Sequence, residues 1–440
     1  MTRQQLRSVI TGLEWLVALM LVLNLNSVYH TILNSRVPTL MDVFLYLLIG
    51  LLGVVSFFNL LKNNRVTHNL LLFIAFYGPL ALGFVIINLV VSHSTSQQIF
   101  INFVAIPLLL IVYMDDAFAE KRAFSILAKI EKIVFFIAAV SLGFWLFSTV
   151  IPVLKATSTI QIFWGPGMTI PSFFGMYFQT QSVTVLGHSL MRNTAIFTEA
   201  PQFACLLSLA VVYNVFLAKK PISKNKILTL AAITTGSVTG IATIIAAFGV
   251  EFYRQMLSQV SLKPEEKRKI KIIANMVVGI AFVLIGLVVA NRVMYGAASV
   301  SARTNDIYAG LHAWLHHPWI GNGVGNYVAI TDYMTPARLL ANGNSGFSSG
   351  IMSTLAYGGL YWGAFFLIPL ICILYKGFKK RLKGNLIIYA LFIFLLLTFT
   401  IINNTLMFVF ISMFEWGVLL FNLESQPYFD DFELMDSEDC

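Results

Sequence analysis

Two segments of the sequence combine residue types that bind anions with residue types that accept protons. The first carries the pattern Arg-x-x-x-Ile-Phe-x-Glu-x-Pro, which begins at Arg192 and includes Glu199. The second begins at Arg303 and reaches the pair His316-His317. Arginine stays ionised and binds anionic oxygens through a planar fork, and glutamate and histidine can act as general bases. These five residues are therefore the first candidates for a functional site.

Simpler structural roles also fit several residues of these segments. Thr198 could cap a helix, with Glu199 complementing its dipole and a proline in its first turn, but this leaves Arg192 unexplained. Adjacent histidines such as His316 and His317, without a nearby cluster of Cys or carboxylates, indicate a polar loop more than a metal site. The glycines at 321, 323 and 325 lack the spacing of a nucleotide-binding loop and indicate a tight turn.

The elements that must position these residues are membrane helices. The chain has 440 residues, of which 58% are hydrophobic and 11% charged, and these fractions exclude a soluble globular protein. A hydrocarbon core of about 30 Å needs about 20 helical residues. Ten apolar runs approach or exceed this length, namely 9–31, 42–61, 69–91, 99–114, 133–153, 200–218, 272–290, 350–375, 385–402 and 404–421.

Charge decides how the apolar stretch 227–253 is placed. Basic residues flank it on both sides, so the positive-inside rule puts both flanks in the cytoplasm. We therefore expect a short hairpin that crosses twice or re-enters and turns near Thr235-Gly236-Ser237. The total becomes about twelve transmembrane helices with cytoplasmic N- and C-termini, which leaves 23 of the 29 Lys and Arg inside and six outside. The net charge of +9 is then mainly a topology signal, and no nucleic-acid partner is expected.

Two predicted outer loops, 154–199 and 291–349, are much longer than the usual connection of about 4–6 residues. Both are rich in Trp, Phe, Tyr and Gly, a composition that argues against disorder. We expect one transmembrane domain over residues 1–440, ending in an acidic cytoplasmic tail at 422–440.

The motifs in these two loops resemble those of the O-antigen polymerase and ligase superfamily. The first is the pattern at Arg192, and the second is Arg-(x)14-Pro-x-x-Gly-x-Gly-x-Gly from Arg303. The resemblance extends over about residues 190–365. It includes Thr235-Gly236-Ser237, where many members have Thr-x-Ser-Arg, and the glycine-rich segment 357–363. Two departures are Val238 in place of that Arg, and Asn342-Gly343-Asn344-Ser345 in place of a His-Asn pair that ligases often carry. The missing His favours the polymerase branch, which includes capsular and exopolysaccharide polymerases.

The resemblance implies an all-α, polytopic, GT-C-like glycosyltransferase that acts on the outer face of the bacterial plasma (inner) membrane without a metal or other cofactor. Its donor and acceptor would be undecaprenyl-diphosphate-linked oligosaccharides, and a flippase and a chain-length regulator would be partners. Cationic side chains would then stabilise the leaving diphosphate. We expect Arg192 and Arg303 to bind it, with Arg292 and Arg338 as further candidates. The general base is expected to be Glu199, which shares a motif with Arg192, or one of His188, His316, His317 and Asp332.

Other functions stay open at this point. A lipid-linked oligosaccharide flippase or a twelve-span carrier would fit the helix count, and carriers place their sites on broken helices or at repeat interfaces. An O-antigen ligase would differ in its acceptor, and a non-catalytic membrane scaffold would need no outer arginines in motifs. Glu14 and Glu415 lie within or near spans and are left outside the site. Aromatic residues of the outer loops could stack on sugar rings or form an interfacial belt; they are Phe163, Trp164, Phe173, Phe174, Tyr177, Phe178, Trp314, Trp319 and Tyr327.

Overall fold

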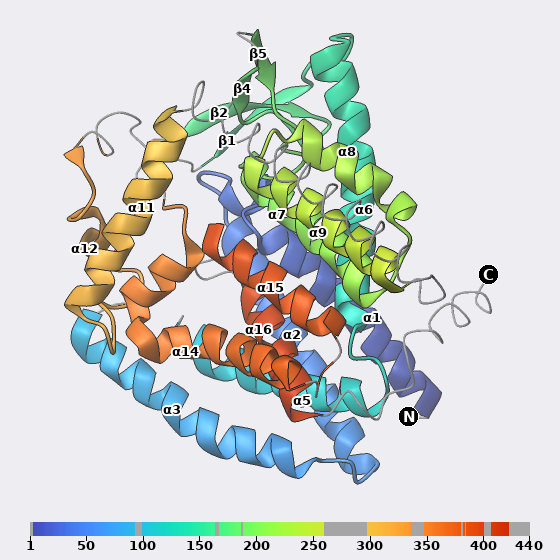
Figure 1. Cartoon of the computed structure of the whole chain (residues 1–440), viewed down its shortest axis with the longest axis vertical. Coiled ribbons are helices and arrows are strands. Elements are labelled where there is room, and N and C mark those ends of the chain that lie inside the picture. The colour runs from blue at the N-terminus through green and yellow to red at the C-terminus, as the bar shows by residue number, and fades with distance from the viewer. Residues whose placement is uncertain are drawn as a thin grey trace, which may run out of the picture. The chain divides into compact units, whose positions relative to one another are not determined.

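The fold is known from a computed structural model (Figure 1). It describes residues 3–92, 99–162, 167–185, 188–258, 297–336, 347–379, 384–399 and 406–421, together with the single positions 339 and 382. The chain divides into two compact units, which are considered separately. The first unit comprises residues 1–133, 163–168 and 303–440, and the second comprises 134–162 and 169–302.

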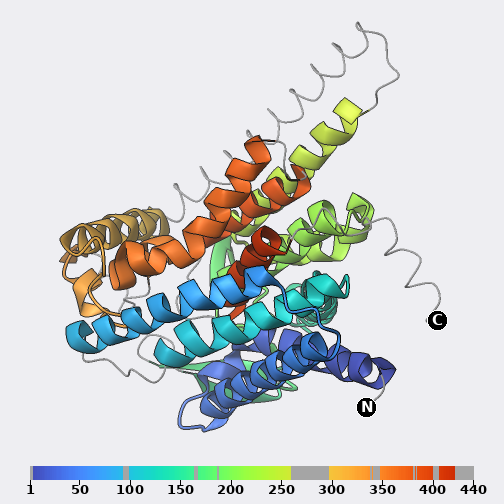
Figure 2. The same ribbon diagram turned by 90° about the horizontal axis from the view of Figure 1, so that it is seen from below.

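The first unit is built from long apolar helices. Within it α2 packs against α1 and α5, α5 packs against α16, and α14 packs against α15 and α16. Figure 2 shows α2, α3 and α5 running along one another. The helices are α1 (Arg3–Asn24), α2 (Val37–Lys62), α3 (His68–Ser92), α5 (Ile106–Ala119), α14 (Gly350–Phe378), α15 (Gly384–Phe399) and α16 (Leu406–Leu420), with a 3-10 turn at Val28–Thr31 and a π-helical turn at Ile101–Ala105.

Helix α2 shows why these segments fold as they do. Its 26 residues are apolar on every side, and one face, with Leu48 and Leu52, is buried against other helices. The opposite face exposes large apolar side chains such as Leu47 and Phe58. A helix that is apolar all round needs apolar surroundings on the side that no protein covers. Lipid is the solvent that satisfies this face.

The second unit is organised around α7 (Ala200–Val212), whose apolar window, extended by a π-helical turn at Tyr213–Leu217, is 94% buried. Helix α7 packs against both α8 (Lys226–Thr234) and α9 (Val238–Ser258). Helix α6 (Ser125–Trp145) begins in the first unit, and its later part, with a π-helical turn at Leu146–Val150, belongs to the second. A 3-10 turn at Ile222–Asn225 precedes α8.

Five short strands occupy the first long loop. β1 (Ser158–Ile162), β2 (Met168–Phe173) and β3 (Tyr177–Phe178) form one sheet in that order, and β2 pairs antiparallel with β3 so that Ser172 lies opposite Phe178. β4 (Ser182–Val185) and β5 (His188–Met191) form a hairpin with Val183 opposite Leu190. Their Thr, Ile and Val content suits strands. The chain is mostly helical, as predicted, and these strands are an addition to the predicted fold class.

Seven described helices are long and apolar enough to cross a membrane, which agrees with a polytopic membrane protein. They match the predicted runs that start at 9, 42, 69, 99, 133, 200 and 350. The runs 385–402 and 404–421 correspond to the shorter apolar helices α15 and α16. The run 272–290 lies outside the described residues.

The hairpin predicted at 227–253 turns where expected. Helix α8 ends at Thr234, α9 begins at Val238, and Gly236 between them has a φ of 59°. Helix α8 has nine residues, which at 1.5 Å per residue reach about 14 Å and fall short of a full span.

The second predicted loop is partly helical. Helix α11 covers Ala297–His316 and is followed by the short helix α12 (Val328–Thr331). Arg303 therefore lies within a helix and not in an irregular loop. The reason is local: alanines at 297, 298, 302, 309 and 313 favour helix, and Ala309 and Ala313 are buried.

Candidate functional site

Arg192 is anchored to the turn between α8 and α9. Its side chain is buried, and its Nε donates to the backbone oxygen of Thr235 at 2.6 Å. Gly236 at this turn has a φ of 59°, a conformation that glycine adopts at low cost, and a Cβ added there would lie 3.9 Å from the same Nε, an ordinary van der Waals contact. The residues Arg192 and Thr235-Gly236-Ser237, which are 43 positions apart, are therefore direct neighbours. The contact with the Thr235 oxygen orients the guanidinium toward this turn.

The residues after Arg192 form a buried, tightly hydrogen-bonded segment. The Asn193 amide donates to Ser141 Oγ of α6 at 3.2 Å and to Thr234 Oγ1 of α8 at 3.0 Å, and its Oδ1 accepts from the Ala195 N–H at 3.2 Å. Ala195 has a φ of 49°, a left-handed conformation that L-residues rarely adopt. Such strain costs about 1–3 kcal/mol and persists only where the surroundings impose it, as they often do at functional sites. Here it lies between Arg192 and Glu199.

Gln181 links Arg192 to the start of α7. Its Oε1 accepts from the Ala200 N–H at 3.0 Å and from Arg192 NH1 at 3.4 Å. The expected cap by Thr198 is wrong, because the N-cap residue is Glu199 and its side chain makes no capping hydrogen bond. Gln181, from the preceding hairpin, supplies a long amide that reaches the first helical N–H instead. Pro in the first turn of α7 is confirmed, and Glu199 is half-buried beside this arrangement.

Arg303 is half-buried on α11, three residues before a carboxylate that the sequence did not single out. Asp306 is fully buried, and its Oδ2 accepts from the Ser348 N–H at 3.0 Å and from Ser348 Oγ at 2.7 Å. Ser349 then caps α14 by accepting from the Met352 N–H at 3.4 Å. The α11 segment with Arg303 is thus fixed to the first turn of α14. The sequence offered one signal for this, a charged residue on the small-residue face of a helix.

The glycine-rich loop after α11 fills a break in α14. Gly359 has φ 60° and ψ −160°, which interrupts the helix. Four backbone hydrogen bonds join the loop to the broken turn: from N–H of Asn322 to O of Ala356 (2.9 Å), from Gly323 to Tyr357 (2.9 Å), from Leu360 to Pro318 (2.8 Å) and from Tyr361 to Trp319 (3.0 Å). A Cβ on Gly321 would lie 2.3 Å from the Tyr357 oxygen. The predicted tight turn is confirmed, and it meets the glycine-rich segment 357–363.

The other predicted site residues have separate positions. His316 and His317 are exposed at the end of α11, with ring centroids 4.6 Å apart, and Asp332 is exposed after α12. Among the described residues, no three His, Cys, Asp or Glu side chains gather as metal ligands would. The predicted ligands Arg292 and Arg338 and the side chain of His188 lie outside the described part of the chain. Arg192 belongs to the second unit and Arg303 to the first.

Glu14 anchors an ion network that sequence reasoning left out of the site. Its fully buried carboxylate accepts from Tyr113 Oη at 2.9 Å, from Lys129 Nζ at 3.0 Å and from Arg122. Arg122 also donates to Asp116 at 2.9 Å. Burial lowers the pKa of Arg122, but Tyr113 and the neighbouring carboxylates together outweigh burial and the pKa is raised, so the guanidinium stays charged. The network ties α1, α5 and α6 together.

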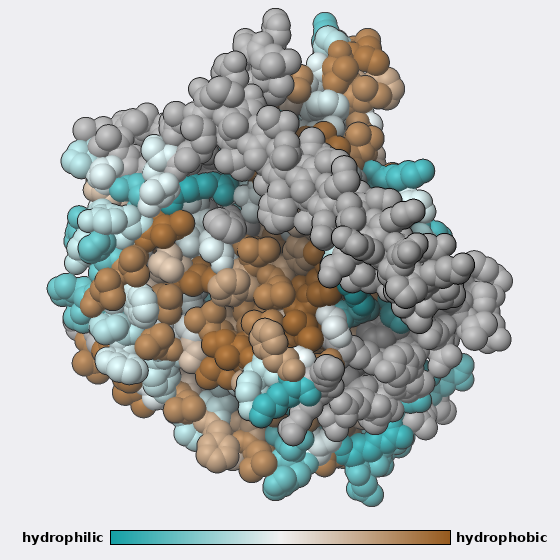
Figure 3. All heavy atoms as spheres, viewed as in Figure 1, coloured by the Kyte–Doolittle hydropathy of each residue, from teal (hydrophilic) through white to brown (hydrophobic). Residues whose placement is uncertain are grey.

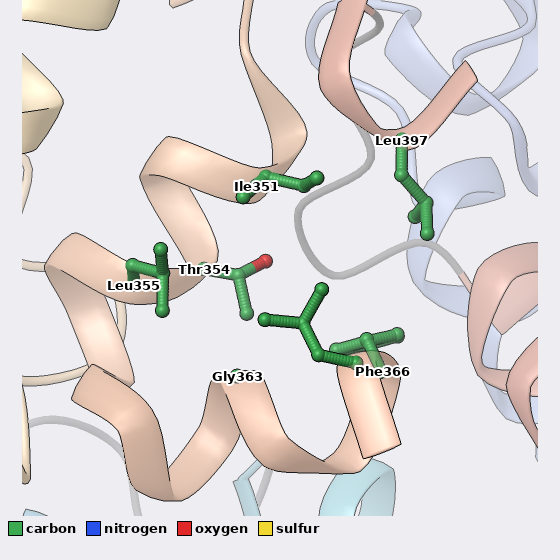
Figure 4. Close-up of a pocket in the computed structure, with 7 residues that line it drawn as sticks. Ile351, Thr354, Leu355, Gly363, Phe366 and Leu397 are labelled. Carbon is green, nitrogen blue, oxygen red and sulfur yellow. The ribbon is translucent and has the colours of Figure 1, made fainter. Parts of the chain in front are cut away.

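An apolar hollow lies beside the break in α14. Figure 4 shows its lining side chains, which converge from both halves of α14 and from α15. Thr354 is the only polar lining residue with a side-chain oxygen, and its Oγ1 donates to the Gly350 oxygen at 2.8 Å. The lining carries no charge, so the hollow suits hydrocarbon and not a diphosphate. It is formed by Ile351, Thr354, Leu355, Gly363, Phe366, Leu367 and Leu397.

Comparison with known proteins identified no relative of this chain. No protein-family model, no curated protein and no solved structure matches this chain. Any statement about function therefore depends on the motifs, their contacts and the chemistry of the side chains.

Proposed function

We propose that the protein is a polysaccharide polymerase that joins undecaprenyl-diphosphate-linked oligosaccharide repeat units on the outer face of a bacterial plasma membrane. The observation that carries the proposal is the contact of Arg192 Nε with the Thr235 oxygen at 2.6 Å. It joins two of the segments on which the resemblance to O-antigen polymerases rests. The contact of the glycine-rich loop with the break at Gly359 joins two others, independently.

The proposed reaction is a glycosyl transfer. A hydroxyl oxygen of the acceptor repeat unit forms a bond to the anomeric carbon of the donor chain, while the bond from that carbon to the diphosphate oxygen breaks. The bonding electron pair leaves with the lipid diphosphate, and the hydroxyl proton passes to a general base. Negative charge grows on the diphosphate, where a preorganised cation is most effective. Arg192, with its guanidinium oriented by Thr235, and Arg303 are proposed for this role.

Glu199 is the proposed general base. It belongs to the same buried segment as Arg192, and Gln181 contacts both Arg192 and the residue after Glu199. Its side chain does not cap α7. His316 and His317 remain weaker candidates, because both are exposed at the end of a helix. The proposal further includes about twelve spans, cytoplasmic termini and a flippase and chain-length regulator as partners.

One observation favours a lipid-linked oligosaccharide flippase or transporter as a second candidate. The break in α14 at Gly359 resembles the discontinuous helices on which transporters build substrate sites. In a transporter the freed backbone groups contact the substrate. Here Ala356, Tyr357, Leu360 and Tyr361 use them for the loop at 318–323. Because the loop already satisfies these backbone groups, the break supports a structural role, and a transporter is our second candidate function.

Deletion of the gene in its native host, followed by gel analysis of surface polysaccharide, tests the proposal. Loss of a polymerase leaves single repeat units in place of long chains, whereas loss of a flippase leaves no units outside the cell. Arg192→Lys keeps a positive charge but loses the fork that contacts Thr235 and Gln181, so chain growth should fall by about 10²-fold. Arg254→Lys on α9, which pairs with Glu251 at 3.5 Å on a partly exposed surface, is the matched control. Long chains in the deletion strain would overturn the proposal.

A further inference from the structure

Helix α11 displays a row of rings on one face. Tyr308 and His312 are four residues apart, and their ring centroids lie 4.2 Å from each other. The ring of Tyr333, from the segment after α12, stacks on His312 with a centroid distance of 5.9 Å and an interplanar angle of 25°. The side chain of Tyr308 is 52% exposed, and His312 and Tyr333 are partly exposed. Tyr308, His312 and Tyr333 together form a ring row.

The opposite face of α11 explains why the rings point outward. Ala309 and Ala313 are fully buried, and a Cβ added to Gly310 would lie 2.7 Å from Met352 Cβ. This small-residue face allows close packing against α14, and Asp306 locks it there through Ser348. Tyr333 is held against His312 because the Thr335 N–H donates to Asn305 Oδ1 at 3.3 Å. These contacts hold together the two segments that carry the three rings.

The chemistry of this face favours a neutral, hydroxylated ligand. Aromatic rings pack against the apolar C–H face of a sugar, while nearby polar groups hydrogen-bond to its hydroxyls. Exposed groups of this kind lie close in the sequence at His316, Asn326 and Asp332. A helix that rests on a bilayer surface is typically rich in Lys and Arg on its polar face. Between residues 303 and 327 the sequence has Arg303 and no other Lys or Arg.

The surface view agrees with this interpretation. In Figure 3 hydrophilic and hydrophobic residues are mixed over α11 and α12, whereas brown, hydrophobic residues predominate over α15. Helix α15 exposes Leu391, Phe394 and Leu395, as a lipid-facing helix does. The three rings and α15 belong to the same unit, and the surface around the rings is less uniformly apolar than that of α15.

We propose that the ring row of Tyr308, His312 and Tyr333 is a saccharide subsite that stacks on a sugar ring of the oligosaccharide. It rests on the proposed polymerase function, because that function supplies a lipid-linked oligosaccharide outside the membrane. The subsite holds the glycan part of the substrate through ring faces, and the arginines act on the diphosphate part. It is therefore a binding site and does not take part in bond making.

Binding of oligosaccharide fragments to the purified full-length protein in detergent tests the subsite. The probe is the set of fragments released by mild acid from the host polysaccharide, and binding is followed by saturation-transfer NMR. Tyr308→Ala and Tyr333→Ala should each weaken binding about 2- to 10-fold, the range expected for loss of one stacked ring. Phe76→Ala on α3, an exposed ring on a membrane helix, should leave it unchanged. Tyr308→Phe keeps the ring and should retain binding.

The outcomes separate the subsite from the proposed function. Equal fragment binding by the wild type, Tyr308→Ala and Tyr333→Ala would overturn the subsite even if the deletion strain has short chains. Weaker fragment binding by these variants supports the subsite even if the deletion strain has normal chains, a result that overturns only the polymerase. A bilayer-facing role is tested in nanodiscs with brominated lipids. If these lipids quench the additional tryptophan fluorescence of Tyr308→Trp relative to the wild type, the ring row lies against lipid and the saccharide assignment is wrong.

Discussion

Gly359→Ala should destabilise the protein by at least about 3 kcal/mol. The backbone at this position has φ 60° and ψ −160°, a region that costs a non-glycine residue about 1–3 kcal/mol. The new Cβ would lie 2.4 Å from the Trp319 carbonyl carbon and 2.6 Å from the Gly321 nitrogen, so the loop must move. Movement of the loop would weaken or break four backbone hydrogen bonds, each of which contributes about 1 kcal/mol net to stability. Strain and lost bonds together give the stated minimum.

Thermal stability in detergent, measured by size-exclusion chromatography after heating, reports this loss. Gly50→Ala on α2 is the matched control, since nothing lies within 4 Å of its added Cβ. Alanine is a better helix former than glycine by about 1 kcal/mol, so the control should be neutral or slightly stabilising. Equal melting of Gly359→Ala and the wild type would show that the loop does not depend on the break in α14, and the reasoning would be refuted.

Three further variants test the other buried contacts, with stability measured in the same way. Asn193→Ala removes three side-chain hydrogen bonds in a buried segment and should destabilise the second unit by about 2–4 kcal/mol; unchanged melting would contradict the described anchoring. Glu14→Gln leaves Arg122 and Lys129 without their shared carboxylate and should cost about 3–5 kcal/mol, visible as a loss of folded protein at normal expression. Asp306→Ala frees the start of α14 from α11 and should cost about 2–3 kcal/mol, with increased proteolysis near Ser348 as a second readout.

Composition and hydropathy predicted the membrane helices well, because lipid selects for long apolar runs regardless of tertiary detail. The predicted turn at Thr235-Gly236-Ser237 is confirmed, and a glycine was a useful sign of it because Gly236 has a positive φ of 59°, which glycine adopts at low cost. The order of the motifs also indicated Arg192 and the Thr235-Gly236-Ser237 turn as functional segments, but it did not indicate that the two are in contact.

Contacts between segments that are distant in the sequence could not be predicted from local sequence patterns. Gln181 caps α7 from another element, and no local pattern identifies a side chain that reaches 19 residues ahead. The Glu14 network was missed because a lone acidic residue in an apolar run gives no sign of its partners. Arg303 was assigned to a loop because its helix, α11, is only weakly apolar and reads as a connection between spans.

The hydrogen bonds between the glycine-rich loop and the broken turn of α14 affect how the protein is inserted during synthesis. Residues 318–323 precede α14 in the chain and leave the ribosome before it does, so the segment that completes the broken turn already exists when that helix enters the bilayer. Without it, the carbonyls of Ala356 and Tyr357 and the N–H groups of Leu360 and Tyr361 would lose these hydrogen-bond partners, and an unpaired backbone group in hydrocarbon costs several kcal/mol. Insertion of α14 as a broken helix is therefore conditional on a segment outside it. A ribosome-arrested chain that lacks residues 318–323 should insert this helix less efficiently than the intact chain.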